Sequence, residues 1–402
     1  MEIKRSDIKI KADPKRVIAK YLDFGPPLED NRVGRLVRDV VSLEEDSVER
    51  LLSEVKSEFG NRHRHMDSIF LEHFQHVESL VPQMVSLSKN HQQLTGAYFS
   101  MEYSIRSAAL FNPSIVAHPD QSGLSKDQKR FIMSLRAVGE GHISSIEFIS
   151  GIVDSDGKIS LEEESKFATL AHQDHSKTFQ KDKLIKRTAI IPDFDRNIFD
   201  QLGPSFTKKQ FESVPEQQWQ DYDSHSQKIL ENIMDSNYDV LFHQEIPLNE
   251  RVIFPKAKQE SKGMEDVRFV EFSENGSSTY IGTYTAYDGH RISPQLIITK
   301  DFLRFKIRTM YGEAVQDKGF ALFPEKINGQ FVMLGRQGGE NITIMFSDNL
   351  FQWETFENIM IPGENWGLTQ LGNSGSPIKT EQGWLVLTHG VGPFRKYVIS
   401  AI

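Results

Sequence analysis

The feature that most constrains the fold is a series of short apolar runs along the second part of the chain. From about Phe111 onward, runs of β-branched and aromatic residues alternate with turn residues, which is typical of short antiparallel strands. Two of the turns are the hairpin-forming pairs Asp288-Gly289 and Asn328-Gly329. Strands this frequent predict a mainly β fold, while a sandwich, a barrel and a propeller all stay open. The clearest runs are residues 280–287, 296–298, 302–307, 320–323, 331–334, 342–346 and 384–388.

Two other parts of the chain carry helical signals. In residues 1–110, Ser42 and Glu45 are spaced as a capping box, and the apolar residues after them recur at helical spacing. A polar stretch, residues 166–236, predicts a helical insertion between strands. We therefore divide the chain into an N-terminal helical region, residues 1–110, and a β domain, residues 111–402. The apolar residues at helical spacing are Val48, Leu51, Leu52, Val55 and Phe59.

The chain ends on the apolar run YVISAI, which looks like a strand with no polar tail after it. A sheet that stops at such a strand leaves an unpaired edge. We therefore expect a C-terminal truncation of the β domain.

Composition excludes several classes of function. The 402 residues contain no cysteine, so a disulfide framework, a thiolate nucleophile and a zinc-thiolate site are all excluded. A net charge of -9 argues against binding to nucleic acid. No apolar run reaches the roughly 20 residues that span a bilayer, and the N-terminus lacks an apolar signal segment, so we expect no membrane association and a cytoplasmic location. We expect His63, His65, His73 and His76 to be solvated helix residues, because metal sites need partners on a common face.

The densest charged group lies in the sequence GMEDVRF. Arg268 stands two residues after Asp266, so the two side chains share one side of an extended chain, while Glu265 points to the other side. One of the two acids is therefore expected to be structural. A solvated turn with a local ion pair is the simpler alternative.

Four further polar residues stand at the ends of three apolar runs. Glu325 and Lys326 come directly after one run, and Arg336 and His389 end two others. Cationic groups at strand ends can receive an anion or a sugar hydroxyl. A salt bridge at a hairpin end and a buried core histidine are the alternatives. The glycine-rich stretches lack the strand-to-helix setting of a nucleotide site, and no GxSxG elbow is present.

Taken together, FNPSIV, GMEDVRF, KGFALFPEKI, MLGR and GSPIKTEQGWLVLTHGVG resemble the ordered motifs of glycoside hydrolase family 130. That family comprises β-mannoside phosphorylases and β-1,2-mannosidases built on a five-bladed β-propeller. The resemblance runs from about Phe111 to the end of the chain. The N-terminal helices and the insertion lie outside the common core and resemble a longer branch of the family.

The resemblance implies roles for individual residues. The family's Glu-Asp-Pro-Arg motif falls on residues 265–268, with Val267 in place of proline, and implies that Asp266 is the general acid. Glu325 falls on a glutamate that is essential in some mannosidase members, and it is the candidate base if water attacks. The resemblance implies substrate-binding roles for Asn112, Arg136, Ser145, Glu265, Arg268 and Lys326, and phosphate-binding roles for Arg336 and His389.

Two departures from the family pattern bear on the reaction. Gly335 stands where phosphorylases carry a histidine, and Gln370 stands where they carry a lysine. Because charge-assisted bonds are the main attraction for phosphate, these changes favour hydrolysis. The resemblance thus implies an enzyme that cleaves β-linked mannosides with inversion, leaning to hydrolysis, without a metal or organic cofactor.

Two alternatives to hydrolysis stay open. A β-mannoside phosphorylase would use inorganic phosphate as co-substrate and give α-mannose 1-phosphate, and a non-catalytic carbohydrate-binding propeller would cleave nothing. The expected partner in each case is a β-mannoside oligosaccharide. The sequence leaves the oligomeric state open, a homo-oligomer included.

Overall fold

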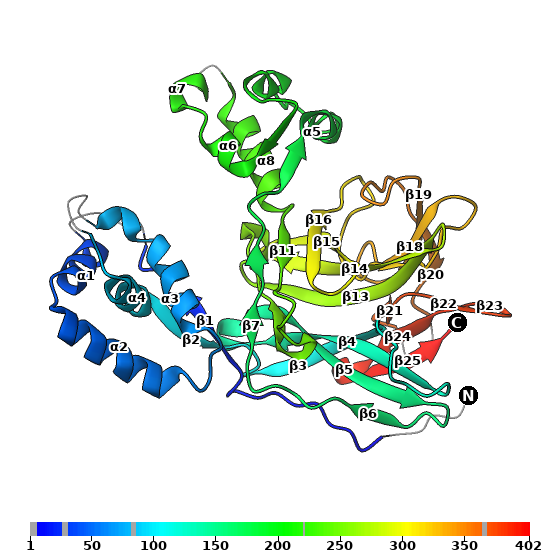
Figure 1. Ribbon diagram of the computed structural model, residues 1–402. Coiled ribbons are helices and arrows are strands. Elements are labelled where there is room, and N and C mark those ends of the chain that lie inside the picture. The colour runs from blue at the N-terminus through cyan, green and yellow to red at the C-terminus, as the bar shows by residue number, and fades with distance from the viewer. Residues whose placement is uncertain (1–5, 26–30, 82–85, 220–221, 364–367) are drawn as a thin grey trace.

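The computed structural model describes residues 6–25, 31–81, 86–219, 222–363 and 368–402. A group of β-sheets forms the centre of the molecule, and two helical lobes extend from it, one formed by the N-terminal helices and one by residues between β9 and β11 (Figure 1). In the described ranges no helix is both long enough and apolar enough to cross a membrane.

The largest sheet consists of two antiparallel groups of strands that meet at one point. The first group is β3-β4-β5 and the second is β13-β14-β15-β16. They are joined by the single parallel pair of Ser144 and Gly263. The bounds are β3 Ala109–Ala117, β4 Gln128–Val138, β5 Ser144–Asp154, β13 Gly263–Glu274, β14 Ser277–Tyr287, β15 Ile292–Thr299 and β16 Arg304–Thr309.

Short strands extend both groups. β11 and β8 continue the second group beyond β16, while β6 and β12 pair with β5, and β7 pairs with β12. A core rich in phenylalanine, including Phe148, Phe269 and Phe305, packs against both groups. The bounds are β6 Ile159–Leu161, β7 Thr169–Leu170, β8 His172–Gln173, β11 Asp239–Leu241 and β12 Arg251–Ile253.

Two further antiparallel sheets follow along the chain. The sheet β17-β18-β19-β20 shares a core with β13 to β15 around the buried Trp353, and the sheet β21-β24-β25 comes after it, with the hairpin β22-β23 alongside. The mainly β fold is therefore confirmed, and the five-bladed arrangement stays a prediction. The bounds are β17 Ala321–Leu322, β18 Phe331–Gly335, β19 Ile342–Ser347, β20 Glu357–Met360, β21 Gln370–Asn373, β22 Ile378–Thr380, β23 Gly383–Leu385, β24 Leu387–Val391 and β25 Tyr397–Ala401.

In its described residues the N-terminal lobe contains the α-helices α1 to α4 beside the two-stranded sheet of β1 and β2. The capping-box interpretation of Ser42 and Glu45 was wrong, because two helices meet there. Ser42 ends the first of them, and the second begins after Glu44 without a side-chain cap. The bounds are β1 Val17–Tyr21, α1 Arg32–Val41, α2 Glu45–Phe59, α3 Met66–Gln75, α4 Lys89–Tyr98 and β2 Ser100–Ser104.

Two of the four N-terminal histidines are buried rather than solvated, which corrects the sequence interpretation. His63 contacts the Glu102 carboxylate at 2.7 Å, and His73 contacts the Ser100 hydroxyl at 2.7 Å. Burial lowers the pKa of His73 to about 4. These two histidines are therefore packing residues whose polar atoms have protein partners.

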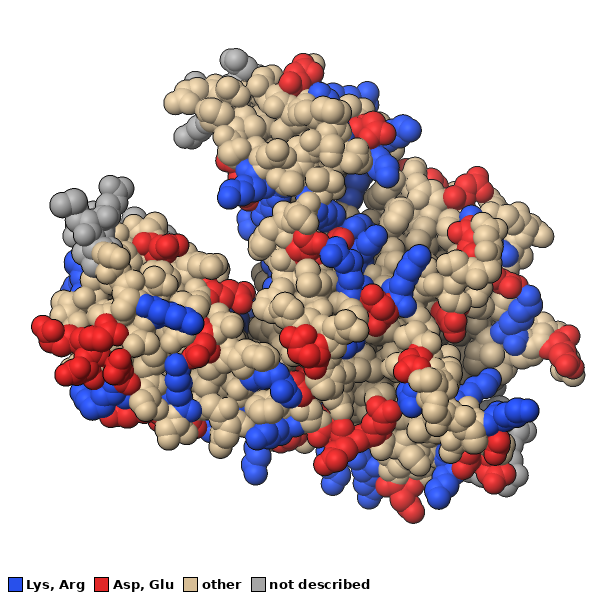
Figure 2. Space-filling view, viewed as in Figure 1, with Lys and Arg blue, Asp and Glu red and all other residues tan. Residues whose placement is uncertain are grey.

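The second lobe has its own apolar core. Phe199, Phe211, Trp219 and Leu230 are buried in it, and α-helices are present within the insertion predicted at residues 166–236. Figure 2 shows Lys and Arg side chains gathering where this lobe meets the sheets. The bounds are β9 Thr178–Gln180, α5 Lys181–Thr188, β10 Ser205–Thr207, α6 Lys208–Glu212, α7 Glu216–Trp219 and α8 Ser224–Asp235.

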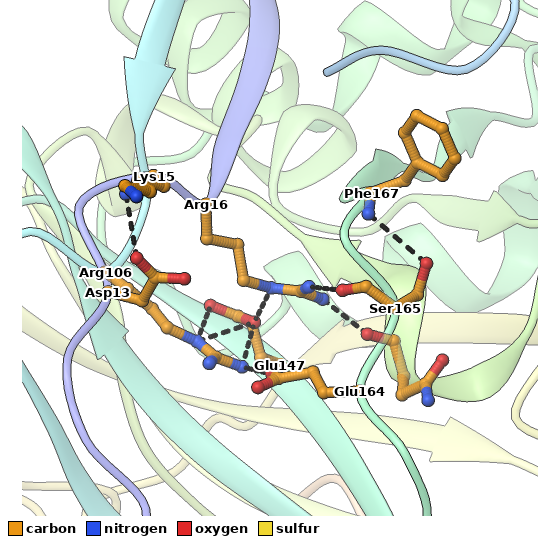
Figure 3. Close-up of polar contacts among 9 residues, drawn as sticks. Asp13, Lys15, Arg16, Arg106, Glu147, Glu164, Ser165 and Phe167 are labelled. Atoms are coloured by element: carbon orange, nitrogen blue, oxygen red, sulfur yellow. Dashed lines mark hydrogen bonds and ion pairs between the residues drawn. The ribbon is translucent and has the colours of Figure 1, made fainter. Parts of the chain in front are cut away.

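A buried ionic network fastens the N-terminal segment to β5 (Figure 3). The Glu147 carboxylate is fully buried between Arg16 and Arg106, at 2.7 and 2.9 Å from their nitrogen atoms. Arg106 also pairs with Glu164, and Arg16 donates to the carbonyl oxygen of Ser165 at 2.8 Å. A buried carboxylate is tolerated only with such partners. The network therefore holds distant parts of the chain in one arrangement.

Candidate active site

A β-bulge in β13 places two carboxylates beside one arginine. The register of β13 against β14 shifts between Glu265 and Arg268, and Asp266 has a φ of 57°. The Arg136 guanidinium donates to Glu265 Oε1 at 2.6 Å and to Asp266 Oδ1 at 3.1 Å. The expectation that Glu265 and Asp266 point to opposite sides was wrong, because a bulge interrupts the alternation of a regular strand.

A second bulge faces the first across the two groups of strands. The register of β3 against β4 shifts between Phe111 and Ser114, and Asn112 has a φ of 49°. The Asn112 amide donates to Asp266 Oδ1, and Ser114 Oγ accepts a bond from the Phe269 N–H at 2.9 Å. The bulges therefore carry Asn112 and Asp266 to the same point.

The other oxygen of Asp266 is available to a ligand. Both hydrogen bonds to the carboxylate go to Oδ1, and within the described ranges Oδ2 has no hydrogen-bond partner. The side chain is 25% exposed. A carboxyl group held through one oxygen and open at the other can exchange a proton with a substrate.

Ser144 rather than Ser145 contacts this group. The Arg136 Nε donates to Ser144 Oγ at 2.9 Å. Neighbouring residues of a strand face opposite sides, so Ser145 points away, and its buried hydroxyl has no partner among the described residues. The substrate-binding role expected for Ser145 stays a prediction.

Arg268, Arg336 and Asn373 meet around Gly319. Arg268 donates to the Gly319 carbonyl oxygen at 2.7 Å. A β-carbon at Gly319 would lie 3.4 Å from Arg336 Cβ, 3.7 Å from Asn373 Oδ1 and 3.8 Å from Arg268 Nη1. The Arg336 Nε and both polar atoms of the Asn373 amide are buried without a partner in the part of the chain that the structure describes. Sequence reasoning missed Asn373, whose only signal was its position in GNSGSP.

His389 joins the same cluster from β24. It lies opposite Gly372 on β21, where a β-carbon would come within 2.6 Å of the His389 ring and 3.5 Å of Arg336 Nη1. Its Nδ1 lies 3.1 Å from the Ser374 hydroxyl. The absence of a side chain at Gly372 therefore lets the imidazole and the guanidinium approach each other.

Burial and electrostatic repulsion lower the pKa values of His389 and Arg268. Burial, with a further contribution from Arg268 and Arg336, lowers the pKa of His389 to about 4. Burial lowers the pKa of Arg268 to about 10, with Arg336 acting in the same direction and Asp266 opposing it. At neutral pH His389 is therefore a neutral hydrogen-bonding group, and the two arginines carry the positive charge.

Glu325 and Lys326 are engaged elsewhere. Glu325 forms an ion pair with Lys379 on β22 and is 38% exposed. Lys326 pairs with Glu274 at 2.7 Å and lies over the Phe331 ring. Among the described residues no hydrogen bond or ion pair joins either one to Asp266. The structure therefore brings together seven of the ten predicted site residues, Asn112, Arg136, Glu265, Asp266, Arg268, Arg336 and His389, and leaves Ser145, Glu325 and Lys326 apart.

Gly335 cannot carry a larger side chain without a rearrangement. A β-carbon there would lie 2.7 Å from Gln337 Oε1 and 3.0 Å from Thr343 Oγ1, and both neighbours are buried. Gln337 donates to the Ala314 carbonyl oxygen at 2.7 Å. The packing around Gly335 therefore gives a structural reason for a glycine at this position.

Comparison with known proteins finds a family model and curated relatives that match part of the chain. Residues 220–400 match the model of glycoside hydrolase family 130, described as beta-1,4-mannooligosaccharide phosphorylase. A 1,2-beta-oligomannan phosphorylase from Thermoanaerobacter sp. is 32% identical over 161 residues, which are 39% of this chain and 52% of the relative. A beta-1,2-mannobiose phosphorylase from Listeria innocua is 30% identical over 156 residues, which are 37% of this chain and 42% of the relative. The match thus spans about half the length of these curated relatives.

Solved structures of lower similarity were also found. A Listeria innocua beta-1,2-mannobiose phosphorylase with bound beta-1,2-mannobiose is 18% identical with a TM-score of 0.36, over 72% of each chain. A Bacteroides ovatus glycosyl hydrolase is 13% identical with a TM-score of 0.42, over 75% of this chain and 68% of that one. Residues 220–400, which are less than half of this chain, are therefore similar in sequence to glycoside hydrolase family 130, and part of the chain is similar to two curated β-mannoside phosphorylases.

Proposed function

We propose that this protein cleaves β-linked mannosides by phosphorolysis, with Asp266 as general acid. The observation that carries the proposal is a set of buried polar atoms beside Arg268 that have no partner among the described residues, namely Arg336 Nε and the Asn373 amide. Asp266 acts electrostatically on the same Arg268. A buried donor left unpaired costs about 1 to 3 kcal/mol, so a ligand that pairs with it is stabilised. Guanidinium groups suit phosphate because they form charge-assisted bonds with its oxygens.

The reaction is an inverting displacement at the anomeric carbon. An oxygen of phosphate attacks that carbon from the face opposite the leaving group, forming the new C–O bond as the glycosidic C–O bond breaks. The proton carried by Asp266 goes to the leaving oxygen, directly or, as the resemblance implies, through a hydroxyl of the substrate. The products are α-mannose 1-phosphate and the shortened mannoside, so all atoms of both reactants are accounted for.

Other polar residues would hold the sugar. Arg136 and Asn112 both donate hydrogen bonds to Asp266 Oδ1, so they fix the orientation of the carboxyl group. Glu265 forms an ion pair with Arg136 at 2.6 Å. Two adjacent acids on one arginine thus have separate roles. Asp266 is the proton donor, and Glu265 positions Arg136 and offers an acceptor to sugar hydroxyls.

Hydrolysis is the second candidate, and two observations favour it. His389 is neutral at neutral pH, and Gly335 carries no cation, so the positive charge of the proposed phosphate site comes from Arg268 and Arg336. Against hydrolysis, the candidate base Glu325 is paired with Lys379. An activated water needs a base close to it, and we therefore favour phosphorolysis.

We further propose that the antiparallel groups of strands are blades of the family's β-propeller. β3-β4-β5 and β13-β14-β15-β16 would be neighbouring blades, since in the described ranges the strand pairing between them is limited to Ser144 and Gly263. The proposed site lies beside this junction, which fits the preference of such folds for sites where several blades meet.

Phosphate binding without any sugar tests the proposal. Titration calorimetry with inorganic phosphate should show binding to the unmodified protein and at least about tenfold weaker binding to Arg336→Met, because a charge-assisted bond contributes about 1.5 to 3 kcal/mol. Arg35→Met, which removes an exposed arginine on α1, serves as the matched control and should bind normally. Equal phosphate affinity in Arg336→Met would reject the proposed phosphate site.

A further inference from the structure

A second pocket lies away from Asp266, between the N-terminal segment and the large sheet. It encloses about 570 Å³, a volume within the usual range of ligand sites. Four separate parts of the chain form its walls. They are β1 with Asp23, the residue Ile143 before β5, β7 with Ala171, and residues 254–261 after β12.

Positive charge dominates the lining of this pocket. Lys20, Lys256 and Lys258 line it, against the single carboxylate of Asp23, and Asp23 already accepts a bond from the Gly25 N–H at 2.8 Å. The Lys20 ammonium lies 5.5 Å from the centre of the Phe254 ring and 5.6 Å from that of Tyr103.

Two further carboxylates lie near Lys256. Burial lowers the pKa of Lys256, and the carboxylates of Glu72 on α3 and of the buried Glu260 oppose this shift. Together with Asp23, three carboxylates therefore face three ammonium groups. Of these carboxylates only Asp23 lines the pocket, and Glu260 is engaged by the hydroxyls of Tyr238 and Tyr284.

The turn that presents two of the lysines is held from below by a buried carboxylate. Glu260 is fully buried and accepts bonds from the Tyr238 hydroxyl at 2.8 Å and from the Tyr284 hydroxyl. It also accepts the backbone N–H groups of Lys256 and Ala257, each at 3.1 Å. These bonds fix the turn before a ligand arrives. Less conformational entropy is therefore lost when the ligand binds.

An apolar wall completes the pocket. Ile143, Leu170, Phe254 and Pro255 line it beside the ammonium groups. We propose that this pocket binds a small phosphate monoester whose phosphate lies among Lys20, Lys256 and Lys258 and whose apolar or aromatic body lies against this wall. Lysine binds phosphate as a point charge, and an apolar surface next to it favours an ester over free phosphate.

The proposed pocket is separate from the mannoside site and does not depend on the proposed function. Ser144 and Gly263, the residues where the two strand groups meet, each stand one or two positions after lining residues, Ile143 and Ser261. Arg136 reaches Ser144 from the site of Asp266. The two sites share no residue and can be tested independently.

Calorimetry with phenyl phosphate as the probe tests the inference. The unmodified protein should bind it, and the double variant Lys20→Met, Lys256→Met should bind at least about tenfold more weakly, because two charge-assisted contacts are lost. Lys300→Met, which removes an exposed lysine between β15 and β16, is the matched control and should bind normally. Lys258→Met should weaken binding as well, and it keeps the test decisive if the double variant does not fold by circular dichroism.

Arg336→Met separates this pocket from the mannoside site. Phenyl phosphate should still bind to that variant through the lysine pocket, and phenol should bind far more weakly than phenyl phosphate. The inference is overturned if phenyl phosphate fails to bind at about 10 mM, if the lysine variants bind it normally, if Arg336→Met abolishes binding, or if phenol binds equally well.

Discussion

Replacing Asp266 with asparagine separates proton donation from sugar binding. The amide has nearly the same shape as the carboxyl group and can still accept the bonds of Asn112 and Arg136 through its oxygen. It cannot donate the carboxyl proton at the second position. Asp266→Asn should therefore retain the site and lose the chemistry.

The expected sizes differ for the two effects, the loss of kcat and the change in substrate binding. General acid catalysis contributes about a hundredfold to ten-thousandfold, so kcat on an unactivated β-mannoside should fall by that factor. Arg136 keeps its charge pair with Glu265 at 2.6 Å, which leaves the guanidinium compensated. Substrate binding should then stay within about tenfold of the unmodified protein.

Glu265→Gln is the matched control for this variant. It removes the other carboxylate from Arg136 but leaves the Asp266 proton in place, so it should raise KM more than it lowers kcat. Steady-state rates of β-1,2-mannobiose cleavage, with product sugars separated by chromatography, give both parameters. If Asp266→Asn turns over at the unmodified rate, or if Glu265→Gln loses as much kcat as Asp266→Asn, the assignment of the acid is refuted.

The remaining predictions concern stability and the base. Glu147→Ala should lower the free energy of unfolding in urea by about 3 to 5 kcal/mol, because two buried arginines lose their partner, whereas Glu164→Ala, which removes a carboxylate that is 42% exposed, should cost under about 1 kcal/mol. Because the pKa of His389 is lowered to about 4 in the folded protein, the unfolded state binds a proton at higher pH, and the free energy of unfolding should fall as the pH decreases from about 6.5 towards 4. If the urea midpoint of a His389→Asn variant depends on pH as steeply as that of the unmodified protein, this prediction is contradicted. Glu325→Gln should leave the phosphorolysis rate within about twofold of the unmodified rate, since the Glu325 carboxylate pairs with Lys379. A hundredfold loss, measured as phosphate released from α-mannose 1-phosphate in the synthetic direction, would show that Glu325 takes part in the reaction.

Local pattern was enough to predict many of the strands and the motif around Asp266. Residues 280–287 fall within β14 and residues 331–334 within β18, because a run of β-branched and aromatic residues between turn residues specifies a strand locally. Asp266 and Arg136 were also identified in advance, through the resemblance. These predictions depended on short stretches of sequence.

The arrangement of the site depends on contacts that no local pattern records. Asn112 meets Asp266 across 154 positions of the chain, and the bulges that aim both residues arise only when strands pair. The orientation of Glu265 was therefore predicted wrongly from regular alternation. Asn373 has an ordinary sequence setting, and its buried amide becomes visible only when Gly319 and Arg336 lie next to it.

The most direct measurement of the central claim is the identity of the sugar product with and without phosphate. Purified protein is incubated with β-1,2-mannobiose, and the products are followed by proton and phosphorus NMR. Phosphorolysis at the Asp266 site predicts α-mannose 1-phosphate and an equal amount of mannose when phosphate is present, and no cleavage when it is absent. Free mannose formed at the same rate in both samples, without any sugar phosphate, would contradict phosphorolysis and establish hydrolysis.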